Sequence, residues 1–92
     1  MIRSFKHRGL KELWGKGTVA GIKPSHEQRI LRLLDSLDAA TKPEDMAVPG
    51  YKWHGLKGNK AGSYSVTVSG NWRITYKWDG VGAIVVNYED YH

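Results

Sequence analysis

Residues 63–86, SYSVTVSGNWRITYKWDGVGAIVV, decide the fold of this chain. Apolar and polar side chains alternate on both sides of the Ser-Gly-Asn step at 69–71, and the Asp-Gly step at 79–80 leads into a further apolar run. Such alternation is typical of strands whose two faces differ, and such steps are typical turns between antiparallel strands. The stretch therefore predicts an antiparallel β-meander.

The residues before this meander follow a helical period. The strongest pattern is an apolar stripe within residues 25–40, and Ser25-His26-Glu27-Gln28 has the form of a capping box at its start. The stripe consists of Ile30, Leu33, Leu34 and Leu37. A shorter helix is predicted over residues 6–14, and short strands are predicted over residues 1–5 and 51–56.

Two helices followed by a meander predict an α+β fold, in a single domain that spans residues 1–92. The N-terminal helices are expected to pack on one face of a mainly antiparallel sheet, against Trp72, Ile74, Tyr76 and Trp78. The opposite face is then expected to be open, basic and rich in hydroxyl groups. It would carry Ser65, Thr67, Arg73, Thr75 and Lys77.

The composition restricts the possible chemistry. The formal net charge of +5 favours an anionic partner, either RNA or DNA, and is equally compatible with an acidic protein. The sequence has no cysteine, and its histidines lack the spacing of a zinc site, so no metal or other cofactor is expected. Without a signal peptide or an apolar stretch of membrane-spanning length, the protein is expected in the cytoplasm, away from membranes.

The last six residues, NYEDYH at 87–92, bring acid–base side chains to the end of the final predicted strand. Metal-free RNA cleavage needs a base for the 2′-hydroxyl, a cation for the charge that grows on the phosphate, and an acid for the leaving 5′-oxygen. The candidates are His92, Asp90 and His54 for proton transfer, Arg73 and Lys57 for the charge, and Tyr91 for holding the nucleotide.

Some of these candidates have a plainer interpretation. Arg73 could instead form a solvated ion pair across strands with Glu89 or Asp90. Lys57 lies in a predicted turn, where a lysine is more often solvated than catalytic. His54, taken alone, is by default a structural histidine. The residue pattern leaves these alternatives open.

Several motifs resemble the HigB-type toxins of the RelE/ParE superfamily of toxin–antitoxin modules. They are Met1–Phe5, Leu56-Lys57-Gly58, Asn71-Trp72-Arg73-Ile74 and residues 87–92. The resemblance implies a RelE-like fold and a ribosome-dependent endoribonuclease that cuts mRNA in the ribosomal A site. It also implies a cognate helix-turn-helix antitoxin of the HigA type. Carried over by position, the active-site residues it implies are Lys57, Arg73, Asp90, Tyr91 and His92, with His54 close to the motif.

Other function classes remain open at this point. The ParE branch of the same superfamily consists of gyrase poisons, which bind their target without an active site. A non-catalytic RNA- or protein-binding module on this fold is a further alternative, because fold does not fix function. The Asp-Tyr-His sequence at 90–92 favours the nuclease, since a pure binding protein needs no side chain that transfers protons near neutral pH.

Overall fold

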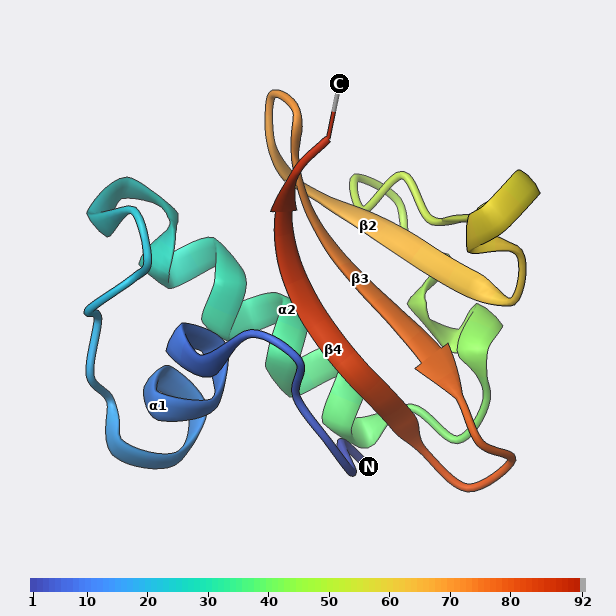
Figure 1. The fold of residues 1–92 in the computed structure, drawn as a ribbon, viewed down its shortest axis with the longest axis horizontal. Helices are drawn as coiled ribbons and strands as arrows, with labels where there is room; N and C mark the ends of the chain where they lie inside the picture. Colours follow the sequence, from blue (N-terminus) through green and yellow to red (C-terminus); the bar gives the residue numbers. More distant parts are fainter. Residues whose placement is uncertain (92) are drawn as a thin grey trace.

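The computed structural model describes residues 1–91. Its two α-helices come before the sheet in the chain, and the main strands follow one another along the last third (Figure 1). The elements, with η for a short 3₁₀ helix, are α1 (Arg8–Lys16), η1 (Pro24–His26), α2 (Glu27–Ala39), η2 (Pro43–Met46), β1 (His54–Gly55), η3 (Gly58–Lys60), β2 (Ser63–Ser69), β3 (Trp72–Trp78) and β4 (Ala83–Asp90). This order confirms the predicted α+β fold.

The strands form a 4-stranded antiparallel sheet in the order β1-β2-β3-β4. One row of paired residues crosses all of them: His54, Ser65, Thr75 and Asn87. Between Thr75 and Lys77 the register to β4 shifts, and Val85 in β4 has a φ of 47°. Across this shift β4 has one residue more than β3. This irregularity is a β-bulge, which bends the strand and increases its local twist.

The N-terminal residues run beside β4 in parallel. They form isolated bridges, Ile2 with Ala83 and Phe5 with Val86, rather than the strand predicted over residues 1–5. Their approach is close enough that a side chain at Gly82 would collide with the carbonyl oxygen of Met1.

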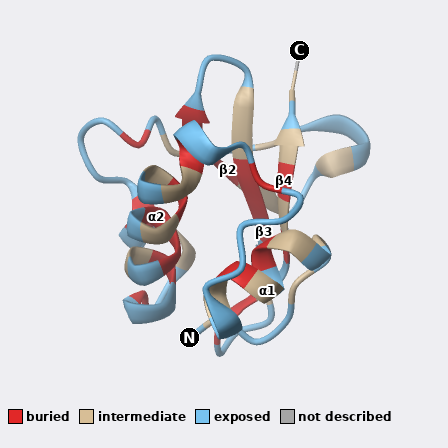
Figure 2. Ribbon diagram, turned by 90° about the vertical axis from the view of Figure 1, so that its left-hand side faces the viewer, coloured by how far each residue is buried: buried red, intermediate tan, exposed pale blue. Residues whose placement is uncertain are grey.

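Both helices and one face of the sheet share a single hydrophobic cluster. The predicted stripe of α2 is fully buried, as are Val66 and Ile74 from the facing strands. Figure 2 shows the buried positions of both helices on the sides that face the sheet. The helix-facing side of the meander was therefore predicted correctly from its alternation.

The start of α2 differs from the prediction. Residues 24–26 form η1, so α2 begins at Glu27, and its N-cap residue His26 makes no side-chain cap. The His26 ring is buried instead, with Nδ1 2.6 Å from the hydroxyl of Tyr88. The predicted capping box at Ser25 is wrong because a proline-initiated turn and this long-range contact determine the local structure.

The strand predicted over residues 51–56 is reduced to β1. Lys52 has a φ of 52°, and the buried Tyr51 places its hydroxyl 2.8 Å from the Ser36 hydroxyl on α2. The chain before β1 is therefore held by the helix layer. A sequence pattern of period two could not reveal this contact.

The opposite face of the sheet is less open than the sequence predicted. Ser65 and Thr75 are buried, with 2% and 5% of their surfaces exposed. Thr75 lies beneath the Glu89 carboxylate, which accepts a hydrogen bond from its hydroxyl, and Ser65 is a short side chain in the interior strand β2. The expectation of an exposed, hydroxyl-rich face is therefore wrong, while Lys77 is exposed as predicted.

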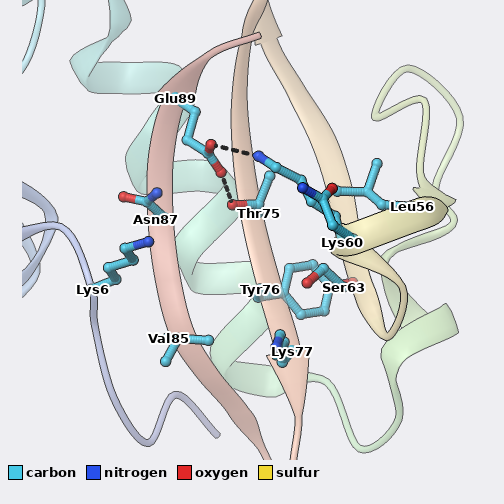
Figure 3. A pocket seen from close by; sticks show the side chains of 11 residues that line it. Lys6, Leu56, Lys60, Ser63, Thr75, Tyr76, Lys77, Val85, Asn87 and Glu89 are labelled. Atoms are coloured by element: carbon cyan, nitrogen blue, oxygen red, sulfur yellow. Dashed lines mark hydrogen bonds and ion pairs between the residues drawn. The ribbon is translucent and has the colours of Figure 1, made fainter.

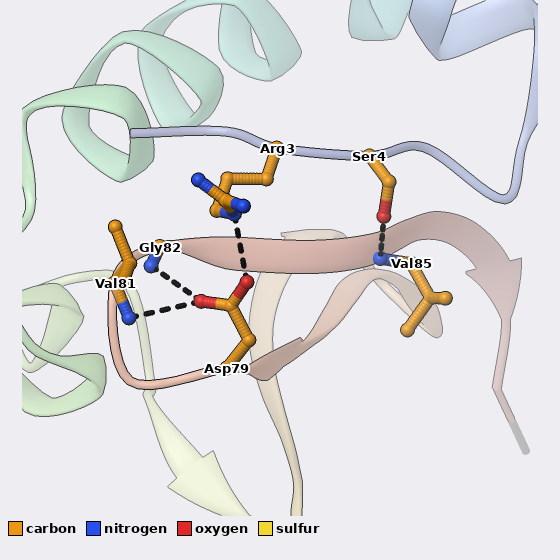
Figure 4. A network of polar contacts seen from close by, with 6 residues as sticks. All are labelled: Arg3, Ser4, Asp79, Val81, Gly82 and Val85. Atoms are coloured by element: carbon orange, nitrogen blue, oxygen red, sulfur yellow. Dashed lines mark hydrogen bonds and ion pairs between the residues drawn. The ribbon is translucent and has the colours of Figure 1, made fainter.

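The turn between β3 and β4 depends on Asp79 (Figure 4). Its Oδ1 accepts hydrogen bonds from the backbone N–H groups of Val81 and Gly82, at 2.9 and 2.8 Å. Its Oδ2 lies 2.7 Å from Nε of Arg3, which ties the N-terminal residues to the turn. These backbone hydrogen bonds and the Arg3 charge hold the pKa of Asp79 below its usual value.

We expect Asp79→Ala to lower the thermal unfolding midpoint at neutral pH by about 5 °C, because the turn loses its acceptors. A depressed folded-state pKa stabilises the fold above the unfolded value of about 3.9, and this contribution is lost as the pH falls through the lower folded value. Thermal unfolding measured against pH should therefore show the two proteins converging in acid. A difference that persists unchanged in acid would contradict this account.

Candidate active site

The face of the sheet opposite the helices contains a polar hollow of about 190 Å³ (Figure 3). The η3 segment borders it on one side and β4 on the other, with β3 between them. The charged side chains that line it are Lys6, Lys60, Lys77 and Glu89. The hollow is thus the place where the segment after Lys57 meets β3 and β4.

A group of polar contacts crosses this hollow. Lys60 Nζ donates to Glu89 Oε1 at 3.0 Å, and Thr75 Oγ1 donates to Glu89 Oε2 at 2.5 Å. Partial burial favours the protonated form of Glu89, but the hydrogen bonds from Thr75 and Lys60 outweigh it and lower the pKa of the carboxyl group. Glu89 is therefore ionised at neutral pH, and its carboxylate binds both Lys60 and Thr75.

Arg73 lies on β3 in register with Glu89, next to the β2–β3 turn. Its Nη1 donates to the carbonyl oxygen of Gly70 at 2.8 Å, which aims the guanidinium at the end of the sheet. The ion pair between Arg73 and Glu89 that the sequence allowed is not formed, because Glu89 binds Lys60 and Thr75 instead. The side chain of Arg73 is half-buried.

Lys57 is exposed and immediately precedes η3. His54 is also exposed, on β1, with Nδ1 3.1 Å from the carbonyl oxygen of Lys52. Its neighbour Trp53 takes the inward position, where its indole N–H donates to the Tyr76 hydroxyl at 2.9 Å. Of these two neighbours, Trp53 rather than His54 therefore faces inward, and the role of His54 stays a prediction.

Asp90 ends β4 and is exposed, and Tyr91 follows it. The backbone N–H of Tyr91 donates to the carbonyl oxygen of Asn71 at 2.7 Å, so this residue remains attached to the β2–β3 turn. Lys60 Nζ lies 4.7 Å from the centre of the Tyr91 ring. His92, the proton-transfer candidate, lies outside the described residues.

The structure brings several of the predicted residues to one end of the sheet. Asp90 is in register with Trp72, the residue before Arg73 in β3, and Tyr91 is bonded to the turn that precedes Arg73. Within the described residues, Lys57 makes no hydrogen bond or ion pair with this group; it shares a hydrogen-bonded turn with Lys60, whose ammonium group faces Tyr91. His54 lies apart from Arg73, on the row of paired residues that contains Thr75. Sequence reasoning missed Lys60 and Glu89, since a contact between residues 29 positions apart leaves no local pattern.

Comparison with known proteins identifies the family. The family model described as "RelE-like toxin of type II toxin-antitoxin system HigB" matches residues 3–92. The chain belongs to this HigB-like toxin family. The predicted resemblance is thereby confirmed, and so is the assignment to a type II toxin–antitoxin module, which implies a cognate antitoxin as partner.

Curated relatives agree with this HigB-like assignment. The chain is 45% identical to "Endoribonuclease HigB" of Proteus vulgaris over 92 residues, which cover 100% of both chains. It is 32% identical to "Toxin HigB-1" of Vibrio cholerae over 84 residues, 88% of each chain. Full-length similarity of this kind extends across the helices as well as the motif-bearing strands.

Within residues 1–91, no helix is long and apolar enough to cross a membrane. Over the same residues, no group of three or more His, Asp or Glu side chains is arranged to hold a metal ion.

Proposed function

We propose that this toxin is a metal-independent endoribonuclease that cleaves mRNA in the ribosomal A site and so stops translation. The observation that carries the proposal is that Arg73, Asp90 and Tyr91 lie at one end of the sheet, while Lys57 belongs to the same hydrogen-bonded turn as Lys60, whose ammonium group faces Tyr91. The full-length relative in Proteus vulgaris that is named an endoribonuclease supports the same reaction.

The reaction is attack of a ribose 2′-oxygen on the adjacent phosphorus with departure of the 5′-oxygen. Arg73 and Lys57 would stabilise the negative charge that grows on the phosphate oxygens, since preorganised cations at developing charge contribute strongly to rate. We assign His92 to protonation of the leaving 5′-oxygen and Asp90 to orienting that imidazole. Tyr91 would hold the nucleotide by stacking.

His54 is the second candidate for proton transfer. It is exposed on β1, and its row across the sheet passes through Thr75 and Asn87 rather than through Arg73. We propose that His54 assists at the edge of the site. The base that accepts the 2′-hydroxyl proton would be His54 or Asp90, because His92 is assigned the acid role and Lys57 the stabilisation of charge.

The proposed partners follow from this reaction. The ribosome would present the mRNA, and a helix-turn-helix antitoxin of the HigA type would restrain the toxin. The net charge of +5 suits a surface that approaches RNA. We propose a cytoplasmic protein with one catalytic domain over residues 1–92.

Ribosome dependence is directly testable. A chain of 92 residues offers little surface to align an mRNA, and alignment accounts for a large share of catalytic rate. We expect negligible cleavage of free mRNA and strong cleavage of the same mRNA on translating ribosomes, measured by mapping the 5′ ends of the fragments.

Efficient cleavage of naked RNA at matched concentrations would contradict the ribosome requirement. The same preparation tested for DNA supercoiling by gyrase distinguishes the ParE-like alternative, since a gyrase poison would stop supercoiling and leave the mRNA intact. Translation arrest without new RNA ends would instead indicate a non-catalytic binding module.

A further inference from the structure

The short helix η3 carries a link between two parts of the proposed active site. Its last residue, Lys60, donates its backbone N–H to the carbonyl oxygen of Lys57 at 3.3 Å, so both lysines belong to one hydrogen-bonded turn. Just before this turn, the N–H of Leu56 donates to the carbonyl oxygen of Ser63 at 2.8 Å. The turn is therefore bonded to the start of β2, and it lies on the side of the hollow opposite β4 (Figure 3).

The Lys60 side chain connects this turn to β4. It extends from η3 across the hollow, and Nζ ends 3.0 Å from the carboxylate of Glu89 on β4 (Figure 3). The acceptor is itself fixed, because its other oxygen binds the Thr75 hydroxyl on β3. Three separate elements, η3, β3 and β4, thus meet at one carboxylate.

The same ammonium group also faces Tyr91. Nζ of Lys60 lies 4.7 Å from the ring centre, within the range of a cation–π interaction. The backbone of Tyr91 is already held by Asn71. Contact with the ammonium group therefore restricts the remaining freedom, which is the orientation of the ring.

We propose that Lys60 is a positioning residue, which holds the turn that carries Lys57 and the ring of Tyr91 in their places by binding Glu89. The inference rests on the proposed nuclease function and deepens it. The Lys60 and Glu89 side chains retain 39% and 25% of their exposure. Since such partly exposed ion pairs add little to folding stability, the main effect is expected on cleavage rate.

The test compares Lys60→Met with Lys11→Met on translating ribosomes. Methionine keeps the length of the stem and removes the charge, and Lys11 is an exposed lysine of α1 that does not line the hollow. We expect Lys60→Met to lower the maximal cleavage rate by about 10–100-fold, because small displacements of reacting groups are costly. The Lys11 variant should keep a maximal rate close to that of the parent.

Glu89→Gln separates positioning from simple attraction of RNA. If Lys60 acted only as a charge, removing the negative charge of Glu89 would strengthen binding to the ribosome and preserve the rate. Under our proposal Glu89→Gln slows cleavage as Lys60→Met does, and the double variant is no slower than either single one. Lys60→Arg, which can still bind the carboxylate, should recover most of the rate.

A readout independent of activity distinguishes this proposal from the proposed function. Amide hydrogen exchange of Lys60, Ala61 and Tyr91 should accelerate in Lys60→Met and stay unchanged in Lys11→Met. If the parent cuts no RNA but this acceleration is seen, the nuclease assignment fails and the positioning role stands. Unchanged exchange, or equal cleavage by the two methionine variants, would overturn the positioning role.

Discussion

Replacing His92 by alanine should slow mRNA cleavage on ribosomes by about 10²–10⁴-fold and relieve growth arrest, because loss of an acid–base group has an effect of this size. The expectation rests on chemistry and on the sequence, in which His92 follows Asp90 by two positions. An imidazole titrates near neutrality, so it can protonate the leaving 5′-oxygen at cellular pH. The measurements are single-turnover cleavage of ribosome-bound mRNA and growth after induction.

His92→Gln provides the matched control. Glutamine keeps hydrogen-bonding groups of similar reach but cannot transfer a proton near neutrality, so we expect it to be nearly as slow as alanine. Both variants should bind ribosomes and unfold at the same temperature as the parent. A glutamine variant that cuts at the parental rate, or an alanine variant that is equally toxic at equal expression, would transfer the acid role to Asp90 or another member of the site.

The parts of the fold that follow local periodicity could be predicted from the sequence. The stripe of α2 lies at consecutive turns of one helix, and the alternation around Ile74 places every second residue on one side of a strand, so burial is encoded within a few positions. The start of α2 and the length of β1 could not be predicted in this way. They depend on His26 meeting Tyr88 and on Tyr51 meeting Ser36, which are contacts between distant residues.

The candidate site divides in the same way. Arg73 and Asp90 could be placed at one end of the sheet from the strand order and turn positions. The resemblance, rather than spacing, singled out Lys57. Lys60 and Glu89 are ordinary charged residues in the sequence, and only the folded chain brings η3 and β4 to the two sides of one hollow and places Lys60 Nζ 3.0 Å from Glu89 Oε1. The alternation of apolar and polar residues along β3 likewise does not indicate that Thr75 is buried beneath Glu89.

Arg73→Ala should lower the cleavage rate by about 10²–10³-fold at saturating ribosomes, the usual cost of removing one group that stabilises transition-state charge. In the structure the guanidinium is already oriented by its bond to the Gly70 carbonyl oxygen, so little reorganisation is needed when the phosphate arrives. The interaction strengthens as charge grows on the phosphate oxygens, so the maximal rate should fall more than the affinity for ribosomes.

Arg73→Lys and Arg32→Ala complete this experiment. Lysine retains the charge but loses the planar, bidentate geometry, so Arg73→Lys should recover only part of the lost rate. Arg32 is exposed on α2, in the helix layer, and Arg32→Ala removes the same charge far from the reacting phosphate. If both alanine variants slowed cleavage equally, net charge alone would explain the loss. A large loss in Arg73→Ala only, with an intermediate rate in Arg73→Lys, would show that the reaction needs a guanidinium at this place in β3, in register with Glu89 and next to the turn that holds Tyr91.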